Sequence, residues 1–229
     1  MGGLLTFRTK SIMHRVQIAY AYVNHFTQKS SLSTLLDCLP AKLHTDILRY
    51  KFEKDRYTRA IGKYLLLKQL EELGYEATVL QRLEKNAFDK PFLKNTPLAF
   101  SIAHSEDLVL CAITSEAQLG VDVEYIKQID ITIFQDQFNP AEWKNIQADA
   151  SLHAFYNYWT RKESIIKADG RGLQIPLSSF DTTQAIVQLN DTPTQWHLQP
   201  LNLDPCYKVH LCTNPHISRV NVKKYLCDW

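Results

Sequence analysis

The sequence predicts a mixed α/β protein in which each half combines several strands with one prominent helix. Residues 16–23 and 120–125 are short apolar or alternating runs, which are typical of strands. Residues 49–74 and 155–173 instead carry apolar side chains at helical spacing and end near a glycine. A chain of 229 residues can bury a sizeable core, either as one large domain or as two small ones.

The first half is expected to begin with a strand over residues 16–23 and a helical segment over 32–48, which is either broken or started at Pro40. The main helix follows, with Asp55 as a plausible N-cap and Gly74 as its stop. Its apolar stripe comprises Tyr57, Ile61, Tyr64, Leu65 and Leu73.

Three arginines, Arg49, Arg56 and Arg59, cluster at the start of this helix. They fit either solvated charge near a helix end or a phosphate clamp, because guanidinium groups match phosphate oxygens and a helix N-terminus favours anions. Lys90 lies in a turn-rich connection, where it fits an ordinary loop lysine.

A hairpin is predicted from a strand at residues 98–103, a turn at 104–107 and a strand at 108–113. This prediction puts His104 at the bend. A histidine there is either exposed polar chemistry or a contact for an anion such as a phosphate.

The run Gly120–Tyr125 alternates, so Val121 and Val123 share one face while Asp122 and Glu124 share the other. This fits a half-buried strand with a polar outer face. It also fits a pair of oxygen ligands for Mg²⁺, which prefers a few carboxylates together with substrate phosphates. A third ligand would have to come from elsewhere, and Glu163 is the candidate.

In the helix over residues 155–173, Phe155, Trp159, Glu163 and Lys167 recur every four residues and fall on one side. This mixture fits an amphipathic helix with a surface Glu–Lys pair, or a helix whose charged residues bind a ligand. Gly170 fits a left-handed helix stop.

Asn139-Pro140, with Glu142 three residues after the cap, predicts the start of another helix. Short alternating runs after Arg171 predict a β-rich ending, expected to be antiparallel.

Composition excludes several classes of protein. The net charge of +2 gives no bulk basic field for nucleic acid, and no apolar run approaches the length of a membrane span. The five cysteines show no CxxC spacing, which argues against a zinc site or a disulfide framework. We therefore expect a cytoplasmic protein that binds neither nucleic acid nor membrane.

Three blocks now stand together in order: FSIAHS at 100–105, GVDVE at 120–124 and FYNYWTRKESIIK at 155–167. Together they resemble the 4′-phosphopantetheinyl transferases of the longer, surfactin-synthetase-activating type. The family pattern of Gly-hydrophobic-Asp-hydrophobic-Glu, followed by Trp-x-x-Lys-Glu-[Ser/Ala]-x-x-Lys, is met in full. Either acidic block alone would be unspecific, whereas the joint pattern is specific.

The resemblance implies an α/β (α+β) fold of two similar subdomains related by a pseudo-twofold. Residues 1–117 would supply contacts for the coenzyme A nucleotide, and residues 118–229 would supply the metal ligands and the catalytic helix. Because the long form carries both halves in one chain, a monomer is expected.

The implied activity is transfer of 4′-phosphopantetheine from coenzyme A to a serine of an apo acyl or peptidyl carrier protein, releasing 3′,5′-ADP. The implied cofactor is Mg²⁺, with Mn²⁺ as an alternative. A Mg²⁺-dependent nucleotide phosphohydrolase and a non-catalytic module that binds coenzyme A or a carrier protein remain alternatives.

Carried over by position, the metal ligands would be Asp122, Glu124 and Glu163. Glu163 would also be the catalytic base, with Lys167 and Asp122 as the other catalytic residues. The contacts for coenzyme A would be Arg49, Lys90, His104, Ser105, Lys162 and Lys167. The chain departs from the family pattern at Asp89, Ala103 and Glu106, all near the nucleotide end. Phe134 and Phe138 fit either core positions or a contact surface for the carrier protein.

Overall fold

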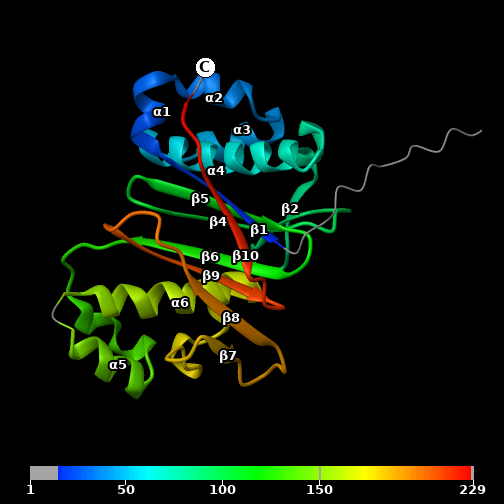
Figure 1. Cartoon of the computed structure of the whole chain (residues 1–229). Helices are drawn as coiled ribbons and strands as arrows, with labels where there is room; N and C mark the ends of the chain where they lie inside the picture. Colours follow the sequence, from blue (N-terminus) through cyan, green and yellow to red (C-terminus); the bar gives the residue numbers. More distant parts are fainter. Residues whose placement is uncertain (1–14, 150, 228–229) are drawn as a thin grey trace, which may run out of the picture.

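The computed structural model describes residues 15–149 and 151–227, so the outermost ends of the two predicted subdomains lie outside the described residues. The described part contains two four-stranded sheets with helices on the outer side of each (Figure 1). The mixed α/β class is therefore confirmed, while the pseudo-twofold relation stays a prediction.

The first sheet has the strand order β10-β1-β5-β4. Its strands are β1 (Arg15–Tyr22), β4 (Ala99–Ser105), β5 (Leu108–Thr114) and β10 (Arg219–Lys224). The helices that cover its outer face are α1 (Val23–Lys29), α2 (Leu32–Asp37), α3 (His44–Leu48) and α4 (Glu53–Glu72) (Figure 1). A small ribbon, β2 (Leu83–Lys85) with β3 (Pro91–Leu93), stands beside them.

The second sheet has the order β6-β9-β8-β7. Its strands are β6 (Gln118–Tyr125), β7 (Ile186–Gln188), β8 (Gln195–Pro200) and β9 (Tyr207–Asn214). Two helices belong to this half, α5 (Pro140–Gln147) and α6 (His153–Asp169). Asn139 and Glu142 form the predicted capping box at the start of α5.

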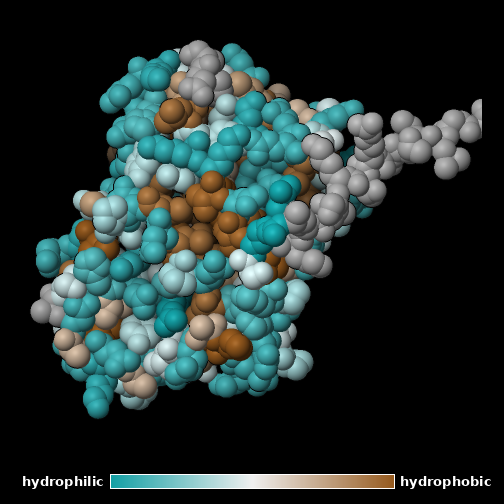
Figure 2. Space-filling model, in the orientation of Figure 1, coloured by the Kyte–Doolittle hydropathy of each residue, from teal (hydrophilic) through white to brown (hydrophobic). Residues whose placement is uncertain are grey.

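Hydrophobic contacts join these layers. Phe26, Ile61 and Leu65 belong to the core between the outer helices and the first sheet. Ile18 and Leu110 of the first sheet share a second core with Val121 of β6. In space-filling view, apolar side chains gather at the level of the sheets, between the more hydrophilic helical layers (Figure 2). No helix among the described residues combines the length and apolarity needed to cross a membrane.

Two serines join the neighbouring edges of the two sheets. The backbone N–H of Val121 donates to Ser101 Oγ at 3.1 Å, and that of Tyr125 donates to Ser105 Oγ at 3.0 Å. Because β4 thus runs beside β6, the pair His104-Ser105 is brought next to the acidic pair of the second sheet.

Gly120 allows α6 to lie directly on β6. A Cβ atom at this position would stand 2.1 Å from Ser164 O and 2.3 Å from Ala168 N, and both of these are backbone atoms. No larger residue fits without moving the helix. The glycine of the GVDVE block therefore sets the distance between the acidic strand and the helix that carries Glu163 and Lys167.

Three local predictions are corrected. Helix α4 begins at Glu53 after an extended Phe52, so Asp55 lies in the first turn and is not the cap. His104 belongs to β4, because pairing continues to Ser105 opposite Leu108; the turn lies beyond it, where Glu106 adopts φ 49°. The last strand, β10, pairs parallel with β1, so the ending is not wholly antiparallel and the second half returns a strand to the first sheet.

Candidate functional site

A cleft of about 280 Å³ lies between the first sheet with its helices, here called the first half, and the second sheet with its helices, called the second half. Its first wall comes from β4 and from the turn before β3, and its second wall comes from α6 and the residues that follow it. The lining includes Phe88, Lys90, Ser101, Glu163, Lys167 and Gly170. Two of the predicted catalytic side chains therefore face the same cavity as residues of the first half.

Lys167 and Asp122 form an ion pair at the base of α6. The Lys167 ammonium donates to Asp122 Oδ1 at 2.6 Å, and Asp122 is only 3% exposed. Although burial opposes it, the Asp122 carboxylate and this hydrogen bond raise the pKa of Lys167 above its usual value. Lys167 is therefore a fixed positive charge beside the acidic strand.

Glu124 and Glu163 add two further carboxyl groups around this pair. Burial and the negative charge of Asp122 raise the pKa of Glu124 to about 7, although Ser105 Oγ donates to Glu124 Oε2 at 2.7 Å. Burial and Asp122 likewise raise the pKa of Glu163. The three acids thus repel one another, and the Lys167 ammonium opposes that repulsion.

This donor set suits a divalent cation. The buried Asp122 Oδ2 has no hydrogen-bond partner among the described residues, and oxygen ligands of this kind are what Mg²⁺ prefers. Between residues 15 and 227, position 150 aside, no group of three or more His, Cys, Asp or Glu side chains is arranged to hold an ion as it stands. The residues fit a metal by their chemistry and charge, and their assignment as ligands is a proposal.

Arg49 and Arg59 form an exposed basic surface on the first half, near His104. His104 is exposed at this surface, and partial desolvation together with the charges of Arg59 and Lys167 lowers the pKa of His104, so its imidazole is neutral at pH 7. Arg49 and Arg59 lie over the ring of Tyr50, at 5.4 Å and 4.6 Å from its centroid. These groups lie on the first half of the molecule, whereas the carboxyl groups lie on the second.

Lys162 is not available to a ligand, which corrects the expectation that it contacts coenzyme A. Its ammonium is 0% exposed, pairs with Glu142 Oε2 at 2.8 Å and donates to the carbonyls of Leu177 and Phe180 at 2.7 and 2.8 Å. One residue along a helix is a rotation of about 100°. Lys162 therefore faces the core of the second half while Glu163 faces the cleft.

The side chains that recur every four residues along α6 fall into an aromatic group and a charged group. Phe155 is buried and Trp159 partly buried in an aromatic cluster with Phe134 and Phe138, while the two charged members of the row line the cleft. Phe138 is only 5% exposed, so it belongs to the core and does not offer a surface to a carrier protein. The aromatic part anchors the helix, and the charged part carries the chemistry.

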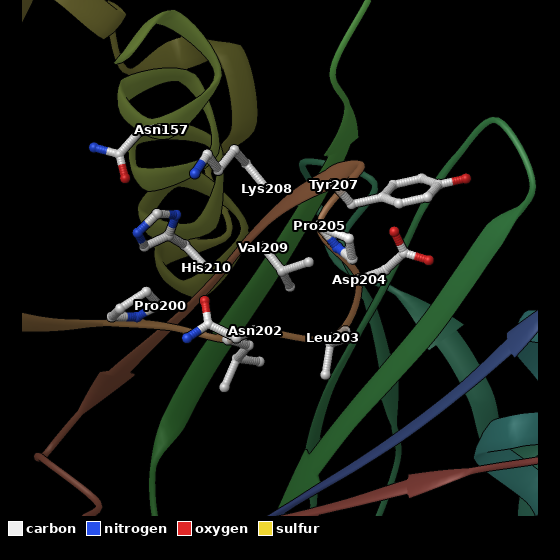
Figure 3. A pocket seen from close by; sticks show the side chains of 11 residues that line it. Asn157, Pro200, Asn202, Leu203, Asp204, Pro205, Tyr207, Lys208, Val209 and His210 are labelled. Carbon is white, nitrogen blue, oxygen red and sulfur yellow. The ribbon is translucent and has the colours of Figure 1, made fainter. Parts of the chain in front are cut away.

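A second cavity, of about 360 Å³, lies over the start of β9 and the loop before it. Lys208 and His210 lie beside α6 there, whereas Tyr207 points away from the helix (Figure 3). His210 is the cross-strand neighbour of Asp122, and its Nδ1 is hydrogen-bonded to Thr160 Oγ1 at 2.8 Å. The contact between His210 and Thr160 could not be predicted from the sequence, because nothing in the local pattern places a strand histidine against a helix threonine.

His210 makes stability depend on pH. Burial lowers its pKa from 6.5 to about 3, so between these values the unfolded chain binds a proton that the folded protein does not. The free energy of unfolding must fall as the pH falls through this window. Between pH 6.5 and about pH 5, we expect the free energy of unfolding to fall by about 2 kcal/mol less in His210→Gln than in the wild-type protein, as measured by urea unfolding. Equal losses in both proteins would contradict this.

Comparison with known proteins agrees with this geometry. Residues 118–217 match the family model of the 4′-phosphopantetheinyl transferase superfamily. The chain is 31% identical over 194 residues to the 4′-phosphopantetheinyl transferase gsp of Aneurinibacillus migulanus, which covers 79% of this chain and 81% of that protein. It is 33% identical over 140 residues to the 4′-phosphopantetheinyl transferase Sfp of Bacillus subtilis (strain 168), covering 57% and 62% of the two chains.

A further relative is the 4′-phosphopantetheinyl transferase HetI of a Nostoc species, 29% identical over 184 residues and covering 72% of this chain and 76% of that one. The family match contains β6, α6 and β9, and therefore contains Asp122, Glu124, Glu163 and Lys167. The similarity to gsp reaches well beyond that segment and covers most of both proteins. The chain belongs to the 4′-phosphopantetheinyl transferase family.

Proposed function

We propose that this protein transfers the 4′-phosphopantetheine group of coenzyme A to a serine of an apo carrier protein and releases 3′,5′-ADP. The observation that carries the proposal is the group of Asp122, Glu124, Glu163 and Lys167 beside a cleft between the two halves. The names of the relatives support the same activity.

In the reaction, the serine oxygen attacks the phosphorus that carries the pantetheine arm, and the bond from that phosphorus to the bridging oxygen of the diphosphate breaks. Such a transfer depends mainly on positioning and on neutralising charge. Mg²⁺ or Mn²⁺, held by Asp122, Glu124 and Glu163, would supply charge neutralisation at the phosphates when bound.

The protein's own residues handle the proton and the leaving group. Glu163 accepts the proton of the serine hydroxyl and so acts as the general base. The Lys167 ammonium stabilises the negative charge on the departing phosphate, because it lies one helical turn from Glu163. The hydrogen bond from Ser105 orients the Glu124 carboxylate.

At the nucleotide end, Arg49 and neutral His104 would offer cationic and hydrogen-bonding contacts to phosphate or base. Both ends of the proposed site come from a single chain, which supports a monomeric enzyme. The five free cysteines support a reducing compartment such as the cytoplasm.

The test is to incubate the protein with an apo carrier protein, coenzyme A and Mg²⁺, and to measure the mass of the carrier. We expect a gain equal to one phosphopantetheine, lost when EDTA removes the metal or when the acceptor serine of the carrier is replaced by alanine. Release of nucleotide without a mass gain would favour a phosphohydrolase. Neither product would favour a non-catalytic binding module. A panel of apo carriers from fatty-acid, polyketide and peptide synthases would identify the acceptor class.

A further inference from the structure

We infer that the turn Asn86–Lys90 of the first half caps the C-terminal end of α6 and so fixes Glu163 and Lys167 in the cleft. Lys90 is then a positioning residue and not a direct contact for phosphate. This inference rests on the proposed function for its effect on catalysis. Its structural part stands independently on the contacts between the turn and the helix.

Two side chains of the turn bind carbonyl oxygens at the end of the helix. The Lys90 ammonium donates to Ala168 O at 2.6 Å, and Asn86 Nδ2 donates to Gly170 O at 3.2 Å. The last carbonyls of an α-helix have no partner within the helix. A positive charge is also favoured there by the helix dipole. The first half therefore completes the hydrogen bonding of a helix that belongs to the second half.

Asn86 also builds the turn from which Lys90 reaches out. Its Oδ1 accepts from the backbone N–H groups of Phe88 at 2.8 Å and Lys90 at 2.9 Å. The backbone N–H of Asn86 donates to the backbone carbonyl of Lys90 at 2.9 Å. One end of the amide thus shapes the turn while the other end binds the helix, which fixes the direction of the Lys90 side chain.

Gly170 makes room for this arrangement. It adopts φ +89°, which ends the helix and favours glycine. A Cβ atom at this position would lie 2.6 Å from Lys90 Cδ, so the stem of the lysine passes over the bare backbone. Burial lowers the pKa of Lys90, which agrees with an ammonium enclosed between the two halves.

The cap acts on the residues that matter for catalysis. Lys167 immediately precedes Ala168, and Glu163 lies one turn earlier. Both line the same cavity as Phe88 and Lys90. A helix end that loses two hydrogen bonds frays first in its last turn, where Lys167 stands, and small displacements of reacting groups are costly. The contact between the turn and the helix is therefore expected to set the geometry of the cleft.

Lys90→Met, which keeps the apolar stem and removes the ammonium, is the first test, with Lys94→Met as its matched control. Lys94 directly follows β3, is exposed and pairs with Glu84 of β2. In Lys90→Met we expect kcat to fall about ten- to hundredfold, with KM for coenzyme A within about threefold of wild type. Amide exchange in the last turn of α6 should become at least about tenfold faster in the free enzyme.

A large rise in KM with unchanged exchange would instead make Lys90 a ligand contact and overturn the inference. Exchange is measured without substrate, so it also separates this inference from the proposed function. Absence of transfer by the wild-type enzyme would defeat the proposed activity, whereas unchanged exchange in Lys90→Met would defeat the cap.

Asn86→Asp tests the second contact with minimal change in shape. The aspartate keeps an acceptor for the two N–H groups of the turn but puts an oxygen against Gly170 O. We expect faster exchange in the last turn of α6 and a lower kcat. Exchange equal to that of wild type would contradict the inference.

Gly170→Ala and Gly172→Ala form a further matched pair. Both sites have a positive φ, at +89° and +60°, but only position 170 crowds Lys90; the nearest atom at position 172 is Phe88 O at 4.0 Å. Gly170→Ala should therefore lose more activity than Gly172→Ala. The double variant Gly170→Ala/Lys90→Ala should be little less active than Gly170→Ala alone, because the alanine methyl at position 170 already disturbs the contact of Lys90 with the helix. Fully additive losses would count against the cap.

Discussion

Replacing Glu163 by glutamine is expected to lower kcat for phosphopantetheine transfer by about a hundred- to ten-thousandfold, because glutamine cannot take the serine proton. The fold should be retained. Glutamine has the shape of glutamate, and the substitution removes a half-buried charge that Asp122 repels. The measurement is the initial rate of carrier mass gain, with the melting temperature recorded for the same samples.

Glu84→Gln is the matched control, since Glu84 is half-exposed on the β2–β3 ribbon and pairs with Lys94. Its transfer rate should equal that of wild type. Near wild-type transfer by Glu163→Gln would remove the role given to Glu163. A fall in rate accompanied by an equal fall in the folded fraction would assign the loss to the fold instead.

Lys162→Met is expected to be the most destabilising of the substitutions considered, costing about 3–5 kcal/mol of unfolding free energy. The methionine fills a similar volume but leaves the Glu142 carboxylate buried without its cation, and Glu142 is 0% exposed. For a chain of this length the loss corresponds to a melting temperature lower by about 10 °C. Thermal and urea unfolding measure it directly.

Two companion variants separate the ion pair from the packing. Lys144→Met, on the exposed face of α5, should leave stability unchanged. Lys162→Met combined with Glu142→Gln should recover a large part of the loss, because no uncompensated charge then remains. A double variant as unstable as the single one would indicate that packing, and not charge, dominates at Lys162.

The carboxylate group could be predicted from sequence because it depends on two local periodicities. Alternation put Asp122 and Glu124 on one face, and four-residue spacing put Glu163 beside Lys167; the structure retains both relations. The sequence pattern includes a glycine at position 120, but it does not explain why glycine is needed there. The reason is the close approach of α6, which is a tertiary contact.

Lys162 and Lys90 were harder to predict, because the family pattern gives residue types and not directions. Lys162 is adjacent to Glu163 in sequence, yet the rotation of the helix sends it into the core. Its partner Glu142 stands in another helix, and the capping box that identified Glu142 carried no sign of that second contact. Asn86 gave no signal at all, since its partner Gly170 lies 84 residues away.

The return of β10 to the first sheet has a consequence for how the protein is made. Strand β1 is synthesised well before β10, and among the described residues the edge of β1 that faces away from β5 pairs with residues 219–224. Throughout synthesis that edge stays open, and open strand edges are sites of wrong pairing and aggregation. We therefore expect chains stopped before Arg219 to be recovered mainly as aggregates, even though every proposed catalytic residue has by then been synthesised.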